Sequence, residues 1–152
     1  MKKFLFFVLC LFTIVFISGC GNNNIKVLRC SGTNRGNNMS AQGEYVYKFK
    51  NDKLIKLNAI VTFKDITVDN LSSVWDSVKA QFNEQNYPTE EKGYKRTTKA
   101  DDKNYTFTVI LDIDYEKISK ESMKKFEISE DTTKKTYEEI KKESIESSMT
   151  CK

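Results

Sequence analysis

Three carboxylates in the second half of this chain are the residues best placed to do chemistry. Asp112 and Asp114 stand two positions apart in an alternating stretch, so on a strand they point the same way, and Glu116 lies just beyond. Carboxylate oxygens are the ligands that Ca²⁺ prefers. A calcium loop also needs a turn-forming glycine and more oxygen ligands close by, and this segment has neither. We therefore predict a polar strand face that resists aggregation, with no metal site.

Histidine is absent from the chain, and this excludes several classes of site. Ser-His-Asp and Cys-His nucleophiles, histidine-based metalloproteases and His-Cys zinc sites all need an imidazole. No Gly-rich phosphate loop is present either. We predict that the protein is not an enzyme, and the alternative is an envelope enzyme that uses Asp112 and Asp114.

The first nineteen residues have the features of a secretion signal. Lys2 and Lys3 form a basic head, and the apolar run 4–17 follows it. A membrane-spanning helix needs about 20 apolar residues, whereas roughly 7 to 15 are typical of a signal peptide. The run ends in Ile-Ser-Gly-Cys, at residues 17–20, which resembles the lipobox of bacterial lipoproteins. The resemblance implies that Cys20 receives a diacylglycerol, with or without an N-acyl lipid such as palmitate, and that cleavage occurs just before it.

This assignment divides the chain into three parts. Residues 1–19 are the lipoprotein signal peptide, 20–24 are the lipidated cysteine and a short polar tether, and 25–152 are one domain. Two or more acyl chains hold a protein firmly on a membrane. We expect the protein on the outer face of the bacterial cytoplasmic membrane. Its richness in Lys, Asn and Ile is typical of a Gram-positive host. No cofactor is expected besides the covalent lipid.

Two of the four cysteines remain once Cys10 leaves with the signal peptide and Cys20 is acylated. An even pair in an exported domain is usually a disulfide. Cys30 lies near the start of the domain and Cys151 is the penultimate residue, so we predict a structural bond that closes nearly the whole domain. A redox or metal pair is the alternative, although CxxC spacing is missing.

The periodicity of apolar residues predicts five strands and up to three helices. Period-two alternation predicts strands at 25–29, 45–50, 53–63, 94–100 and 105–114, with a loop at 31–42. Helical spacing predicts a first helix at 68–86, with Trp75 as its core anchor and Pro88 as its limit. A second helix is predicted at 119–126, and a capping box at Thr136 to Glu139 predicts the start of a third. The fold class is α+β: an antiparallel sheet of about five strands, made of two hairpins and an N-terminal strand, with two to three helices packed on one face.

Several segments together resemble a known family. The lipobox is followed by Leu28-Arg29-Cys30, by an aromatic hairpin from Tyr45 to Lys53, by Asp-Tyr-Glu-Lys at 114–117 and by a terminal Thr-Cys-Lys. This combination resembles the YehR-like family of small bacterial lipoproteins. The family has no known function, so the resemblance implies an exported, lipid-anchored α+β domain and supplies no catalytic residues.

The charge balance argues against nucleic acid as a partner. Removing Lys2 and Lys3 from 25 basic residues leaves 23 against 21 acidic ones, a net charge of only +2. Lysines outnumber arginines by 22 to 3, whereas nucleic-acid readers favour clustered arginine with interleaved aromatic residues. The Lys-rich stretches are interpreted as solvated faces, and contact with anionic lipid is the alternative.

These observations lead to one hypothesis and two alternatives. The protein is expected to be a lipid-anchored, non-enzymatic binding or envelope-associated module, whose partner besides the membrane is an unidentified protein or small ligand. The first alternative is the carboxylate-dependent envelope enzyme. The second is a docking subunit of a membrane complex that uses an exposed aromatic patch around Tyr45 and Tyr47.

Overall fold

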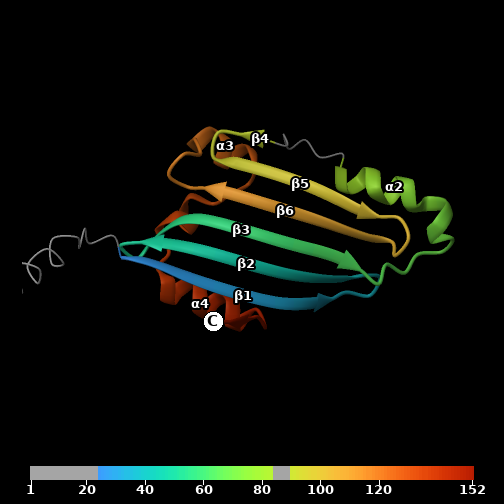
Figure 1. Ribbon diagram of the computed structural model, residues 1–152, viewed down its shortest axis with the longest axis horizontal. Helices are drawn as coiled ribbons and strands as arrows, with labels where there is room; N and C mark the ends of the chain where they lie inside the picture. The colour runs from blue at the N-terminus through green and yellow to red at the C-terminus, as the bar shows by residue number, and fades with distance from the viewer. Residues whose placement is uncertain (1–23, 84–89) are drawn as a thin grey trace, which may run out of the picture.

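The computed structural model describes residues 24–83 and 90–152, so Cys20 and Pro88 lie outside the described residues. The described residues form one antiparallel sheet of seven strands, in the order β4-β5-β6-β3-β2-β1-β7 (Figure 1). The strands are β1 (Ile25–Arg35), β2 (Ser40–Lys50), β3 (Lys53–Lys64), β4 (Glu90–Glu91), β5 (Tyr94–Asp101), β6 (Thr106–Asp114) and β7 (Thr150–Cys151). The predicted α+β class with an antiparallel sheet is confirmed, and the predicted count of about five strands is wrong.

The two predicted hairpins are present, and local turn chemistry explains both. Asn51 and Asp52 join β2 to β3 with φ values of 51° and 63°, the left-handed pair that a two-residue type I′ turn requires. Between β5 and β6, the Asp101 carboxylate accepts hydrogen bonds from the backbone N–H groups of Lys103 and Asn104 at 2.9 and 3.1 Å.

Two short edge strands account for the difference in strand count. Glu90 and Glu91 pair with Lys95 and Tyr94 to make β4, and Cys151 pairs with Cys30 to make β7. Strands of two residues carry no periodicity, so only their partners in space define them.

The predicted loop at 31–42 is wrong. β1 continues to Arg35 and β2 begins at Ser40, joined by a tight turn in which Gly36 N–H donates to the carbonyl of Met39 at 2.9 Å. The glycines and polar residues of this segment give no alternation. On both sides of the turn their backbones are nevertheless paired, up to Arg35 with Ser40. Cross-strand pairing therefore overrides local composition here.

A β-bulge shifts the register of the first hairpin. The pairing of β2 with β3 slips between Lys48 and Phe49, so Phe49 faces Leu54 while Lys48 faces Lys56. Leu54 is consequently fully buried, and Ile55, which strict alternation with Leu57 would place on the buried side, is half-buried.

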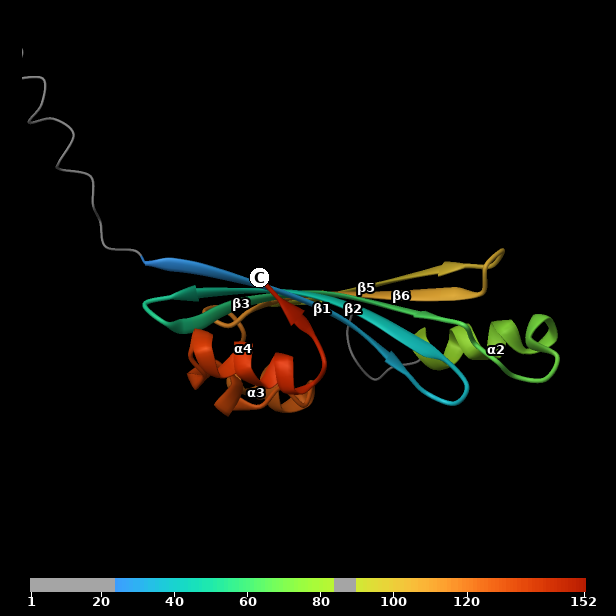
Figure 2. The ribbon, with the colours of Figure 1, turned by 90° about the horizontal axis from the view of Figure 1, so that it is seen from below.

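All described helices pack on one face of the sheet (Figure 2). They are α2 (Leu71–Asn83), α3 (Lys120–Lys125), α4 (Tyr137–Glu146) and the short 3-10 helix η1 (Glu130–Lys134). Ser119 caps α3, and the predicted capping box of Thr136 and Glu139 opens α4. Ile140 and Ser144 supply the buried face of α4, and Ile145 is 52% exposed.

Buried side chains gather beneath α3 and α4, at one end of the sheet. One cluster joins Leu28, Cys30, Phe49, Leu54 and Ile140, and another joins Tyr94, Ile113, Ile118, Met123 and Phe126. At the other end, Trp75 anchors α2 as predicted: it is 4% exposed, and its Nε1 donates to Asp102 at 2.7 Å. The sheet between these two helical groups is less covered, and a cavity lies there.

Candidate ligand-binding cavity

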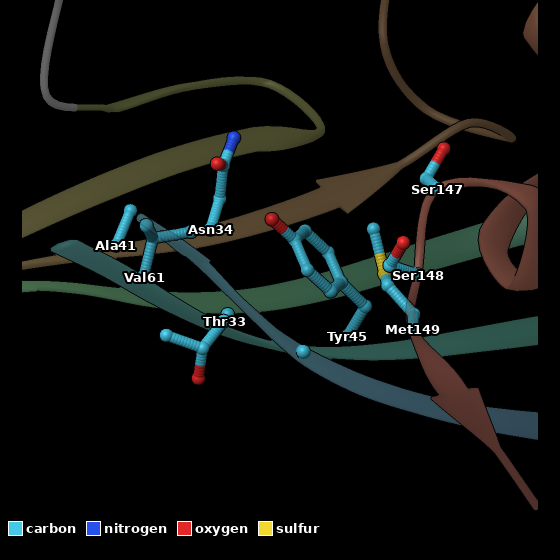
Figure 3. Close-up of a pocket in the computed structure, with 10 residues that line it drawn as sticks. Thr33, Asn34, Ala41, Tyr45, Val61, Ser147, Ser148 and Met149 are labelled. Carbon is cyan, nitrogen blue, oxygen red and sulfur yellow. The ribbon is translucent and has the colours of Figure 1, made fainter. Parts of the chain in front are cut away.

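A cavity of about 500 Å³ lies on the helix-bearing face, beside the end of α4. We call it the Tyr45 cavity. Its walls come from β1, β2, β3 and the turn after α4, and the lining residues are Gly32, Thr33, Asn34, Ala41, Gly43, Tyr45, Val61, Ser147, Ser148 and Met149. Figure 3 shows the Tyr45 side chain between Asn34 and Val61 on one side and Ser148 and Met149 on the other.

Two paired glycines make room for this cavity. Gly32 of β1 faces Gly43 of β2 in the sheet register, so neither strand places a side chain there. A Cβ atom at Gly43 would come within 2.5 Å of the Tyr45 ring, and one at Gly32 would come within 3.1 Å of Met149 Cγ. Glycine in a strand interior often marks such a close approach. The glycine pair therefore allows Tyr45 to lie over its own strand and Met149 to approach the sheet.

The turn after α4 forms the opposite wall. Ser148 adopts a left-handed conformation with φ of 64°. The N–H of Met149 donates to the carbonyl of Ser144 and the N–H of Ser148 donates to that of Ile145, both at 2.9 Å. This is the Schellman arrangement that ends many helices, here with serine where glycine is usual. It explains how α4 ends without the glycine that its sequence lacks, and it points Met149 back toward the core.

A disulfide fixes this wall to the sheet. Cys30 and Cys151 are bonded, as predicted, with their Cα atoms 4.1 Å apart. The neighbouring pair, Arg29 and Lys152, exchanges two backbone hydrogen bonds of 3.0 and 2.8 Å. The cysteines thus occupy the non-hydrogen-bonded position of the ladder, where the side chains of facing residues come closest. The bond holds β7 on β1 two residues away from Gly32 and Met149.

The lining carries no carboxylate, ammonium or guanidinium group. It offers instead an aromatic ring, a thioether, hydroxyl groups and the amide of Asn34. Next to the cavity, burial raises the pKa of the Tyr47 hydroxyl, and Tyr45 and Glu143 add to the rise, while a hydrogen bond with Ser144 opposes it. Tyr47 is therefore neutral at physiological pH. These groups suit the binding of an uncharged molecule with an apolar face.

The three candidate carboxylates lie away from this cavity and do not converge. Asp112 pairs with Lys56 at 3.1 Å, and Asp114 pairs with Lys117 at 2.9 Å. Both point to the face of the sheet opposite the helices, as their positions in β6 require. Burial alone would raise the pKa of Asp114, but the hydrogen bond and charge of Lys117 outweigh it and hold the pKa below its ordinary value.

Glu116 lines a different hollow, near Tyr115 and Lys120. Within residues 24–83 and 90–152, no group of three His, Cys, Asp or Glu side chains is placed to hold a metal ion. Neither the Tyr45 cavity nor the hollow at Glu116 is lined by Asp112 or Asp114.

Tyr45 and Tyr47 do not form the exposed patch that the docking-subunit alternative requires. Both are half-buried on the helix-bearing face, with ring centroids 6.3 Å apart and planes at 14°. Tyr47 packs against the core beside Ile140, and Tyr45 faces the cavity. The sequence therefore pointed to the right aromatic residues but assigned them the wrong surroundings.

Sequence reasoning missed the glycines and the turn after α4. Gly32 lies in the segment predicted as a loop, and Gly43 lies between that segment and the strand predicted at 45–50. A glycine immediately before an aromatic strand was the available signal, since it can let a ring two residues away lie across the backbone.

Comparison with known proteins adds evidence on the fold. No family model matches the chain, and no curated protein matches it. A solved structure does: the NMR structure of a protein from Streptococcus pneumoniae TIGR4 superposes with a TM-score of 0.61 over 90% of each chain, at 10% sequence identity. At that identity the similarity concerns the fold alone.

Proposed function

We propose that this chain is a lipid-anchored extracytoplasmic lipoprotein whose domain is a binding module, with the Tyr45 cavity as its ligand site. The observation that carries the binding role is the uncharged, concave surface around Tyr45. Its volume of about 500 Å³ falls in the range of small-molecule sites, which is roughly 300–1,000 Å³. A neutral ligand can enter without leaving a charge unpaired.

The anchoring role rests on the sequence. The residues at 17–20 resemble a lipobox, and β1 begins at Ile25, five positions after Cys20. The disulfide supports an exported location, because such bonds persist in oxidising compartments. Within the described residues, no helix is both long enough and apolar enough to cross a bilayer.

The same proposal includes a family resemblance and a cellular location. The chain resembles YehR-like lipoproteins, and its place is the outer face of the cytoplasmic membrane of a Gram-positive bacterium. Diacylglycerol and an N-acyl chain on Cys20 would hold it there. The domain would work by binding a small molecule or a neutral segment of a partner, without catalysis and without nucleic acid.

An NMR titration of backbone amides with a library of uncharged fragments tests the binding role. Fragments that bind should shift the amide signals of Gly32, Gly43, Ser148 and Met149. Replacing Tyr45 with Ala should abolish these shifts, because the ring forms the centre of the cavity wall.

The matched control is Val46→Ala, one residue along the same strand with its side chain on the opposite face of the sheet. This variant should leave fragment binding unchanged. Binding that maps elsewhere, or that persists in the Tyr45→Ala protein, contradicts the proposed site.

A further inference from the structure

The face of the sheet opposite the helices is not covered by any described helix (Figure 2). Strand alternation and register assign the side chains that belong to it. We call it the open face. Its charged residues are the basic Arg29, Arg35, Lys48, Lys50, Lys53, Lys56, Lys64, Lys95, Lys99 and Lys152 and the acidic Glu44, Glu90, Asp101, Asp112 and Asp114.

The open face carries the whole positive excess of the described residues. Ten basic residues against five acidic ones leave an excess of five on this face. Residues 24–83 and 90–152 contain 23 basic and 20 acidic side chains altogether, an excess of three. The described residues outside the open face are therefore net negative by two. The small overall charge of the protein hides a separation of charge between its two sides.

Exposed apolar side chains adjoin these lysines at the end of the sheet where the chain enters the domain. Ile25 is 57% exposed and Val27 is 40% exposed. They lie on the open face and pair with Lys50 and Lys48 across the β1–β2 ladder. Exposed apolar groups flanked by lysines are the combination that adsorbs to an anionic lipid surface, since apolar burial and electrostatic attraction act together.

The segment that precedes the domain is short. Cys20 is five residues before Ile25, and a fully extended chain spans at most about 3.6 Å per residue, so the end of the sheet stays within about 18 Å of the lipidated residue. This is about two Debye lengths at physiological salt. Because this distance is an upper limit, the short segment lets the basic face approach the headgroups to within one Debye length, where it experiences the surface potential of the membrane.

We propose that the open face lies against the anionic headgroups of the membrane that holds Cys20, with Ile25 and Val27 at the headgroup boundary. This inference rests on the proposed lipid anchor. It gives the domain a defined orientation. The helix-bearing face and the Tyr45 cavity then point away from the bilayer, where a soluble ligand or partner can reach them.

Amine labelling of the full-length lipidated protein in vesicles tests the orientation. The protein is placed in phosphatidylcholine vesicles with and without phosphatidylglycerol, and acetylation of each lysine is followed by mass spectrometry. Labelling of Lys48, Lys50 and Lys53 should slow by about fivefold in the anionic vesicles, the factor expected for one lysine at such a surface. Labelling of Lys141 and Lys142, on α4, should not change. A tenfold increase in salt should remove the difference.

Two matched charge variants separate the open face from general attraction. Lys48→Glu with Lys53→Glu should abolish the protection of Lys50 in anionic vesicles. Lys141→Glu with Lys142→Glu makes the same change in net charge on the helix-bearing side and should leave that protection intact.

The outcomes distinguish this inference from the anchor on which it rests. If the protein does not float with phosphatidylcholine vesicles, the lipid anchor itself is wrong and the orientation falls with it. If it floats but Lys48 and Lys50 react equally in both kinds of vesicle, the anchor holds and the orientation is wrong. A third outcome is that soluble polyglycerol phosphate protects Lys48 and Lys50 from labelling while phosphatidylglycerol vesicles do not. This result would also overturn the proposed orientation and would assign the open face to an envelope polymer.

Discussion

Replacing Gly43 with Ala tests the construction of the Tyr45 cavity. A strand glycine is normally less stable than alanine by about 0.5–1 kcal/mol, so without steric conflict the substitution should stabilise the protein. Here the added Cβ would lie 2.5 Å from the Tyr45 ring. Forcing an extra carbon into a filled site costs about 1–3 kcal/mol. We expect the balance to be destabilising, by up to about 2 kcal/mol.

A double-mutant cycle isolates this contact. In the Tyr45→Ala background the ring is absent, so Gly43→Ala should become stabilising by about 0.5–1 kcal/mol. The coupling between the two positions should then be about 1–3 kcal/mol, well above the roughly 0.5 kcal/mol seen for independent sites. Urea unfolding followed by tryptophan fluorescence measures all four proteins, with Trp75 as the single reporter.

Gly36→Ala is the control for this cycle. A Cβ at Gly36 meets the Met39 carbonyl oxygen at 3.4 Å, an ordinary contact, and its φ is not in the left-handed region. It should stabilise the protein by about 0.4–1 kcal/mol. If Gly43→Ala stabilises the protein as much as Gly36→Ala does, and shows no coupling to Tyr45, the account of how the cavity is built is wrong.

Three further predictions follow from the same contacts. The double variant Cys30→Ala with Cys151→Ala should lose about 2–5 kcal/mol of unfolding free energy, because the disulfide joins residues separated by 121 positions. A thermal melt of this variant that matches that of the oxidised wild type would contradict the prediction. Burial raises the pKa of Tyr115 to about 12. The stability that its neutral hydroxyl contributes is complete below the unfolded pKa near 10 and is lost between pH 10 and 12. The Tyr115→Phe protein should therefore lose less unfolding free energy over this pH range than the wild type, and identical curves for the two proteins would contradict the prediction. Ser148→Gly should stabilise the protein by about 1 kcal/mol, because glycine adopts a positive φ without strain, and no gain in a urea titration would refute the strained turn.

Local signals predicted the elements whose causes are local. The capping box at Thr136, the cap at Ser119 and the turn at Asn51 each involve residues within three or four positions of one another. The amphipathic stripe placed Trp75 correctly in the core. The disulfide was predictable because the fates expected for Cys10 and Cys20 leave a single pair, which is the pair that is bonded.

Pairing between distant residues determined what the sequence could not show. The outer halves of β1 and β2 alternate poorly, and they are strands because each satisfies the backbone groups of the other. The bulge at Lys48 shifts burial from Ile55 to Leu54, and no local pattern indicates where a ladder slips. The Tyr45 cavity depends on such effects twice, through the register that pairs Gly32 with Gly43 and through a serine that takes the place of a C-terminal glycine.

The most direct test of the central claim is the mass of the N-terminal peptide of the protein extracted from bacterial membranes. We predict a peptide that begins at Cys20 and carries a diacylglycerol, with an added N-acyl chain, and a Cys20→Ala protein that carries no lipid and is not cleaved at this bond. A peptide that retains residues 1–19, or that begins at Cys20 with an unmodified thiol, would contradict the lipoprotein assignment.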